Sequence, residues 1–225
     1  MAISKVGLTT GITGTLPVAN GGTGLASGTT DQFLKFTGTT TLASAADNAG
    51  SMVHLQTSTL GSDASKIEFS NVFSTTYKSY LFVFNQLKST ATSGNFISRL
   101  FSDTGTTSYT SSNYEVVNPT GRGASGSSGT SGSSVFGTAY FGLINEVFHQ
   151  NTPGSGHLYV HNPRDASNRL TISGVMGLHD GTNHRVGMVF GMVTDNAEFY
   201  GMEFLTTSPN LGSGTSISLY GLTNS

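Results

Sequence analysis

The sequence predicts an all-β protein, an antiparallel β-sandwich of jelly-roll type preceded by an extended N-terminal arm. Three observations indicate this fold class. Charged residues make up 10% of the chain, against about a quarter in most globular domains. Ser and Thr together number 63 and Gly 30, and hydroxyl side chains suit strand surfaces and turns rather than surface helices. No stretch of a dozen residues carries apolar side chains at helical spacing.

Residues 1–50 contain too few apolar residues for a core of their own. Their Gly, Ser and Thr content is typical of a disordered linker, which is one interpretation. Isolated apolar residues nevertheless recur along the segment, and we favour an extended arm that becomes ordered only against partner chains. These apolar residues are Ile12, Leu16, Val18, Leu25, Phe33, Leu34, Phe36 and Leu42.

Apolar density rises after residue 50, so one folded domain is expected over residues 51–225. In the segment 66–70, Ile67 and Phe69 alternate with polar residues, which predicts a half-buried strand. The segment 80–84 is apolar on both faces, as in a central strand. About nine short strands are expected in total. They cover residues 66–70, 80–84, 95–101, 135–144, 156–161, 169–175, 185–193, 199–205 and 216–220.

The segment 185–193 has a clear period-two pattern, with apolar residues at 186, 188, 190 and 192, while Val189 and Val193 bury the opposite side. Between the predicted strands, residues 121–134 are almost entirely Gly, Ser and Thr. This composition predicts a mobile surface loop.

The composition also argues against several partners. With a net charge of −2 and a pI near 6.3, the chain has no basic stripe to neutralise phosphates, so nucleic acid is not expected. No run of 18 apolar residues and no signal-peptide core occur, so we expect no membrane insertion. Cysteine is absent, so stability must come from core burial or oligomerisation.

The sequence contains no motif that supports a cofactor site or a catalytic nucleophile. Residues 121–126 read Gly-Arg-Gly-Ala-Ser-Gly, but a dinucleotide site needs a helix after this pattern, and none is predicted. No Gly-x-Ser-x-Gly elbow occurs. We therefore predict no catalytic residues and no cofactor.

A polysaccharide depolymerase would need two carboxylates about 5 to 10 Å apart. Glu198 and Glu203 differ by five positions, so on a regular strand they would point to opposite faces. Glycan hydrolysis is therefore the least favoured function. Several other acids fall in predicted turns or loops, namely Asp31, Asp47, Asp63, Asp180 and Asp195.

His157, Tyr159 and His161 should share the outward face of one strand, with Leu158 and Val160 inward. Two imidazoles so placed could ligate a metal, but no acidic third ligand lies at a matching spacing. A solvated strand face is the favoured interpretation, and no metal site is predicted.

Aromatic residues divide into two predicted groups. Those within predicted central strands are expected to pack in the core, namely Phe82, Phe84, Phe190 and Phe204. Those near loops are expected to be exposed and are the candidates for contact with a receptor glycan or protein, namely Tyr109, Tyr114, Tyr140 and Phe148.

Residues 11–24 read Gly-Ile-Thr-Gly-Thr-Leu-Pro-Val-Ala-Asn-Gly-Gly-Thr-Gly. This stretch resembles the GTLPVANGGTG element that recurs in tail-fibre and related appendage proteins of tailed bacteriophages. The folded domain shows a second similarity. It contains Ile-Glu-Phe at 67–69 and Tyr-Lys-Ser-Tyr-Leu-Phe-Val-Phe at 77–84, and ends with Ser-Leu-Tyr-Gly-Leu at 218–222. These segments are similar to the opening and closing strands of a β-rich module in such fibres, with one extra residue before Ile217.

The resemblance implies a homotrimeric or otherwise oligomeric virion component, assembled in the host cytoplasm, with its arm toward the particle and bound to other virion proteins. Virion attachment and oligomerisation are assigned to Ile12, Leu16, Pro17, Val18, Asn20, Gly21, Gly22 and Gly24. The chain lacks the heptad stem or repeated shaft of a long tail fibre. A short tail fibre that binds the host surface is therefore favoured, and a capsid fibre, decoration or cement protein is the alternative.

Overall fold

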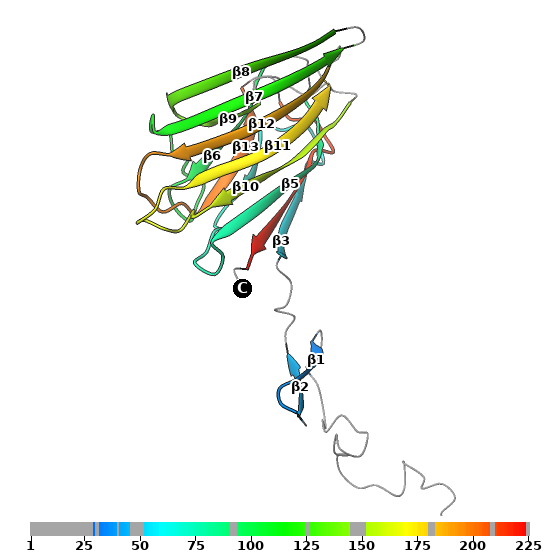
Figure 1. Cartoon of the computed structure of the whole chain (residues 1–225), viewed down its shortest axis with the longest axis vertical. Coiled ribbons are helices and arrows are strands. Elements are labelled where there is room, and N and C mark those ends of the chain that lie inside the picture. Colours follow the sequence, from blue (N-terminus) through cyan, green and yellow to red (C-terminus); the bar gives the residue numbers. More distant parts are fainter. Residues whose placement is uncertain are drawn as a thin grey trace, which may run out of the picture. The chain divides into compact units, whose positions relative to one another are not determined.

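The computed structural model describes residues 29, 32–39, 41–45, 52–90, 94–124, 127–144, 152–179, 183–207 and 210–223. Contacts divide the chain into two units, Met1–Gly50 and Ser51–Ser225. All regular elements of the described residues are β-strands, which confirms the predicted all-β antiparallel sandwich (Figure 1). Among these residues no helix is long and apolar enough to cross a membrane. The strands are β1 (Phe33–Phe36), β2 (Leu42–Ala45), β3 (Met52–Thr59), β4 (Lys66–Phe69), β5 (Ser79–Leu87), β6 (Phe96–Phe101), β7 (Tyr114–Ala124), β8 (Ser127–Thr138), β9 (Phe141–Ile144), β10 (Gly154–His161), β11 (Thr171–His179), β12 (His184–Val193), β13 (Gly201–Thr206) and β14 (Ser216–Leu222).

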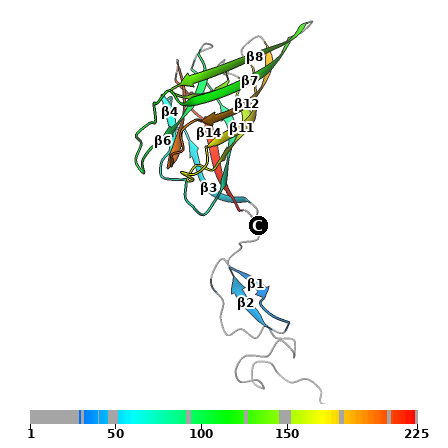
Figure 2. The same ribbon diagram turned by 60° about the vertical axis from the view of Figure 1, so that its left-hand side comes forward.

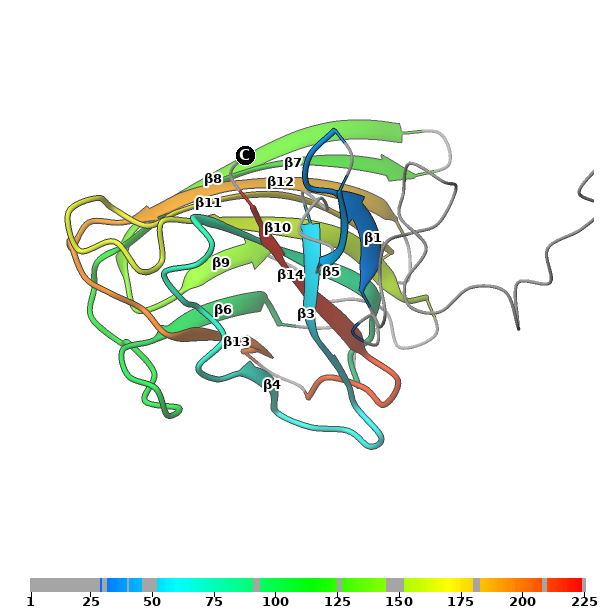
Figure 3. The ribbon, with the colours of Figure 1, turned by 90° about the horizontal axis from the view of Figure 1, so that it is seen from below.

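The second unit consists of two sheets that pack face to face. The larger sheet has eight strands in the order β3-β14-β5-β10-β11-β12-β7-β8, and the smaller has four in the order β4-β13-β6-β9. Figure 3 shows them as two layers, and Figure 2 shows the large sheet obliquely, with β7 and β8 at one side. Every pairing is antiparallel. In this face-to-face packing, the small sheet covers one face of the large sheet.

Phenylalanine rings from both sheets form the centre of the core. Phe82 and Phe84 of β5 contribute from the large sheet. Phe204 of β13, in the small sheet, packs against both, with ring centroids 4.9 and 5.2 Å away. Phe69 of β4 and Phe96 of β6 complete the cluster. All five are at most 1% exposed. The predicted core role of Phe82, Phe84 and Phe204 is confirmed.

The described part of the first unit is a short hairpin, in which β1 pairs with β2 from Phe33↔Ala45 to Phe36↔Leu42. Its two phenylalanine side chains are exposed, Phe33 by 64% and Phe36 by 67%. The attachment residues assigned between Ile12 and Gly24 lie outside the described residues, so their role stays a prediction.

Two segments of the second unit differ from their predicted secondary structure, and strand β3 was not among the predicted strands. Residues 121–124 and 127–134 are strand and not loop, because β7 and β8 form a long hairpin paired from Tyr114↔Thr138 to Ala124↔Ser127. Backbone hydrogen bonds make this hairpin, and its Gly and Ser side chains give no apolar pattern to reveal it. The predicted strand 135–144 is divided, because the chain leaves the large sheet after β8 and enters the small sheet as β9.

Candidate functional site

The outer face of the large sheet, opposite the small sheet, exposes several large apolar side chains. Exposed fractions are 63% for Phe136, 54% for Val186, 52% for Phe190, 46% for Met188 and 45% for Val117. The prediction that Phe190 packs in the core is therefore wrong. An exposed apolar patch of this kind is a common mark of an interaction surface.

Strand β12 explains why Phe190 lies outside. Val189 and Val193 are fully buried between the sheets, so Phe190 and its period-two neighbours must point to the opposite face. Both faces of this strand are apolar in sequence, and the pattern alone does not say which of them the second sheet covers.

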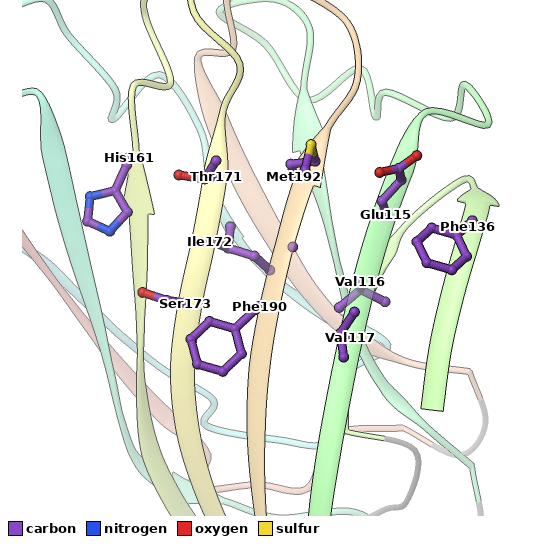
Figure 4. A pocket seen from close by; sticks show the side chains of 11 residues that line it. Glu115, Val116, Val117, Phe136, His161, Thr171, Ile172, Ser173, Phe190 and Met192 are labelled. Carbon is purple, nitrogen blue, oxygen red and sulfur yellow. The ribbon is translucent and has the colours of Figure 1, made fainter. Parts of the chain in front are cut away.

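The outer face contains a recess of about 420 Å³ that we call the outer groove (Figure 4). This volume falls within the range of about 300–1,000 Å³ that is common for ligand pockets. Five neighbouring strands, β10, β11, β12, β7 and β8, supply its walls and floor. The lining residues are Glu115, Val116, Val117, Phe136, His161, Thr171, Ile172, Ser173, Phe190, Gly191 and Met192.

Strand register arranges the lining side chains in two rows across the sheet. The first row follows the pairs Phe136↔Glu115, Glu115↔Met192, Met192↔Thr171 and Thr171↔His161. Directly opposed side chains on one face lie about 4.5–5.5 Å apart at Cβ. The row therefore places a carboxylate, a hydroxyl and an imidazole along one line across the groove.

The second row is mainly apolar. Phe190 is opposed by Val117 on one side and by Ser173 on the other, and Ser173 is opposed by Tyr159 of β10. The groove thus has this mainly apolar row beside the first row, which contributes a carboxylate, a hydroxyl and an imidazole. We call them the apolar row and the polar row.

His161 forms the β10 end of the polar row. Its Nδ1 lies 2.9 Å from Ser79 Oγ, and burial lowers the pKa of its imidazole below the usual value of 6.5. The ring is therefore neutral near pH 7, and because Nδ1 is engaged by Ser79, Nε2 is the ring nitrogen left for a ligand. Glu115 supplies the negative charge. The groove can receive a ligand that has an apolar surface and several hydroxyl or amide groups.

Tyr114 was expected to be exposed and to contact a receptor, and this is wrong. It is fully buried, and its ring packs edge-on against Phe141 with centroids 4.7 Å apart. As the first residue of β7, it points into the space between the two sheets. Burial also raises the pKa of its hydroxyl. Tyr114 is a core residue.

The other three predicted contact aromatics have different outcomes. Tyr109 is half-buried against Phe199, with centroids 5.1 Å apart, and its hydroxyl donates to Asp195. Tyr140 is half-buried in the turn between β8 and β9. Phe148 lies outside the described residues. Tyr109 and Tyr140 are not among the described residues that line the outer groove.

The expected arrangement of His157, Tyr159 and His161 is confirmed. Leu158 and Val160 are fully buried, so the rings of His157, Tyr159 and His161 lie on the outer face. The centroid of the Tyr159 ring is 5.5 Å from that of His157 and 6.0 Å from that of His161. Within the described ranges, no group of three His, Cys, Asp or Glu residues is placed to hold a metal.

Glu198 and Glu203, the two carboxylates compared in the sequence, have different partners in the structure. Glu203 is 1% exposed, and its carboxylate accepts hydrogen bonds from Lys66 Nζ at 3.0 Å and Ser108 Oγ at 2.7 Å. Glu198 instead pairs with Arg164 at 3.1 Å. The Gly-Arg-Gly of the dinucleotide-like pattern lies in strand β7.

Several groove residues were not predicted as site residues from the sequence. Glu115, Val117 and Phe136 fall in the β7–β8 hairpin, of which only 135–138 had been predicted as strand. The available signal was the run Tyr-Glu-Val-Val at 114–117, because aromatic and β-branched residues favour strands. Comparison of the chain with family models, with curated proteins and with solved structures finds no match.

Proposed function

We propose that this chain is a structural protein of a tailed-bacteriophage virion, a short tail fibre or fibre-like appendage subunit whose β-domain binds the host surface. The outer groove carries this proposal, because it combines exposed aromatic rings with a carboxylate, hydroxyls and an imidazole on a rigid sheet. The resemblance of residues 11–24 and 218–222 to phage fibre proteins supports it from the sequence.

The groove suits the two kinds of receptor that a host surface offers. A sugar ring has a face of C–H groups and an edge of hydroxyls, so it would lie on Phe190 or Phe136 while Glu115 accepts hydrogen bonds from its hydroxyls. An apolar side chain of a surface protein would bury against the same rings and Val117. Both kinds of ligand use the apolar row and the polar row together.

In this proposal residues 1–50 anchor the subunit to the particle and to its own copies. Glycine-rich arms can approach one another closely, and sparse apolar residues such as Ile12 and Leu16 then have something to bury against. A homotrimer is the expected assembly, with other virion proteins bound through the arm. The hairpin of Phe33 and Phe36 fits this role, because both rings are exposed.

A structural role as a capsid fibre, decoration or cement protein is the second candidate. The observation that favours it is the edge strand β8, which ends the eight-stranded sheet. Its residues, Ser127–Thr138, include no charged residue and no proline. Edge strands usually carry charged residues or proline, which prevent pairing with other chains. Because β8 has neither, it is suited to contacts within an assembly. A depolymerase has less support, because Glu115 is the single carboxylate among the described groove residues.

A cryo-EM map of the particle tests the assignment. Trimers that project from the tail, with residues 1–50 at their base, fit the fibre, and copies on the capsid select the decoration role. Absence of the chain from the particle contradicts both.

A competition assay tests the groove. The purified chain should block phage adsorption, and Phe190→Ser should abolish the block. Tyr220→Ser provides the matched control, because Tyr220 is on β14 of the same sheet, outside the groove-lining set. Equal blocking by both variants would remove the groove from the proposal.

A further inference from the structure

Two histidines face each other at one end of the β11–β12 pair. His179 is the last residue of β11 and His184 the first of β12, and the register pairs them directly. Directly opposed residues of an antiparallel pair project from the same face of the sheet. Their ring centroids are 4.7 Å apart, with an angle of 69° between the planes.

This separation matches that of two imidazoles bound to one metal ion. At a metal–nitrogen distance of about 2.1 Å, each ring centroid lies roughly 3.2 Å from the ion. Two such rings at about 90–110° around the ion have centroids roughly 4.5–5.3 Å apart. The observed 4.7 Å lies in this interval. His184 is exposed, and χ2 of histidine is a soft torsion, so its ring can turn a nitrogen to the ion without movement of the backbone.

We propose that His179 and His184 form a transition-metal site that joins the ends of β11 and β12. The chemistry of the donors selects the ion, because imidazole suits Zn²⁺, Cu²⁺ and Ni²⁺, whereas Mg²⁺ and Ca²⁺ prefer oxygen ligands. No third His, Cys, Asp or Glu completes the set among the described residues. Water fills the remaining positions of the ion.

Two further histidines of the outer face do not offer this geometry. His157 and His161 lie four residues apart on one strand, β10, which separates them by roughly 13 Å along the strand. Tyr159 also stands between their rings. One ion cannot bind both, so these residues are internal controls for nonspecific binding to single imidazoles.

Isothermal titration of the untagged full chain with ZnCl₂ and NiCl₂ tests the proposal. One saturable site per chain is expected, and MgCl₂ should give none. His179→Gln and His184→Gln should each weaken Zn²⁺ binding roughly 100-fold, because a single imidazole loses the gain from chelation. His157→Gln should bind Zn²⁺ like the wild-type chain.

Thermal unfolding supplies a readout that is independent of the titration. Excess Zn²⁺ should raise the Tm of the wild-type chain and of His157→Gln, because the ion binds the folded state. The rise should be absent in His184→Gln, whose Tm without metal should match the wild type because its side chain is exposed. Unchanged affinity in His184→Gln, or fewer than one ion per chain, would overturn the site.

Discussion

The Tyr114 hydroxyl lies 3.1 Å from the amide nitrogen of Leu100 and accepts its hydrogen. The same hydroxyl donates to the Tyr109 carbonyl at 2.9 Å. Tyr114 belongs to β7 of the large sheet and Leu100 to β6 of the small sheet. Because β9 pairs with β6 only over Phe96–Ser98, the hydroxyl satisfies a backbone group that this neighbouring strand leaves unpaired. One side chain thus joins the two layers of the sandwich.

Tyr114→Phe should destabilise the fold by about 1–3 kcal/mol, because the Leu100 amide is then buried without a partner. Urea denaturation followed by circular dichroism measures the loss. Tyr159→Phe, on the outer face, is the matched control and should change stability by less than about 0.5 kcal/mol. Equal effects of the two substitutions would contradict the role given to the Tyr114 hydroxyl.

Truncation of Phe204 should destabilise the fold far more than truncation of Phe190. Phe204→Ala leaves a cavity among the core rings and should cost about 3–5 kcal/mol, whereas Phe190 is 52% exposed and Phe190→Ala should cost less than about 1 kcal/mol. Chemical denaturation at equilibrium separates these values. A large loss in Phe190→Ala would show that its ring is covered in the folded protein.

Lys66→Met should destabilise the small sheet. Lys66 Nζ contacts Glu68 Oε1 at 2.7 Å and Glu203 Oε2 at 3.0 Å, and Glu203 is buried. Loss of the cation should cost about 1–2 kcal/mol, since Lys66 is itself partly exposed. Lys78→Met is the control, because Lys78 and Asp165 are 3.8 Å apart and Lys78 is exposed, so its loss should be close to zero.

The same ion pairs predict a loss of stability at high pH. The hydrogen bond to Glu68 and the contacts with Glu203 raise the pKa of Lys66 above its usual value of 10.5. The charged form is favoured by folding, so this contribution is complete below about pH 10.4 and is lost as the pH rises through the folded-state pKa. The fall in the denaturation midpoint above pH 10 should be smaller in Lys66→Met. An equal fall in both proteins would contradict the coupling.

His161 predicts a loss of stability at mildly acidic pH. Burial lowers the pKa of its imidazole, so the unfolded chain takes up this proton first, near pH 6.5. Stability should fall as the pH decreases through that value and stop falling below the folded-state pKa. Denaturation midpoints at pH 7.5 and 5.5 should differ less in His161→Gln than in the wild-type chain. The same difference in both would exclude His161 as the source.

Strands were predictable where one face is apolar and the other is not. Ile67 and Phe69 mark β4 by strict alternation, and both are buried as expected. The hairpin of β7 and β8 was not predictable in this way, because residues 125–134 contain no large apolar side chain. Backbone pairing alone holds that part of the sheet, and side-chain periodicity does not report on it.

The groove was predictable only in part. The outward direction of His161 follows from the burial of Leu158 and Val160, and this was read correctly. Its neighbours across the sheet, Thr171, Met192 and Glu115, depend on strand order and register. Strand order in an antiparallel sandwich is set by long-range pairing, so no local pattern contains it.

Local sequence patterns are enough to predict a protein built from β-strands, because sparse charge, abundant hydroxyls and period-two alternation are properties of short segments. Which face of each strand is buried depends on the packing of the two sheets. In β12 both faces are apolar, and the small sheet removes Val189 and Val193 from water while Phe190 stays exposed. This packing also buries Tyr114, because a residue at the end of a loop can point between two sheets. The outer groove exists for the same reason: packing covers one face of the large sheet and leaves the other free.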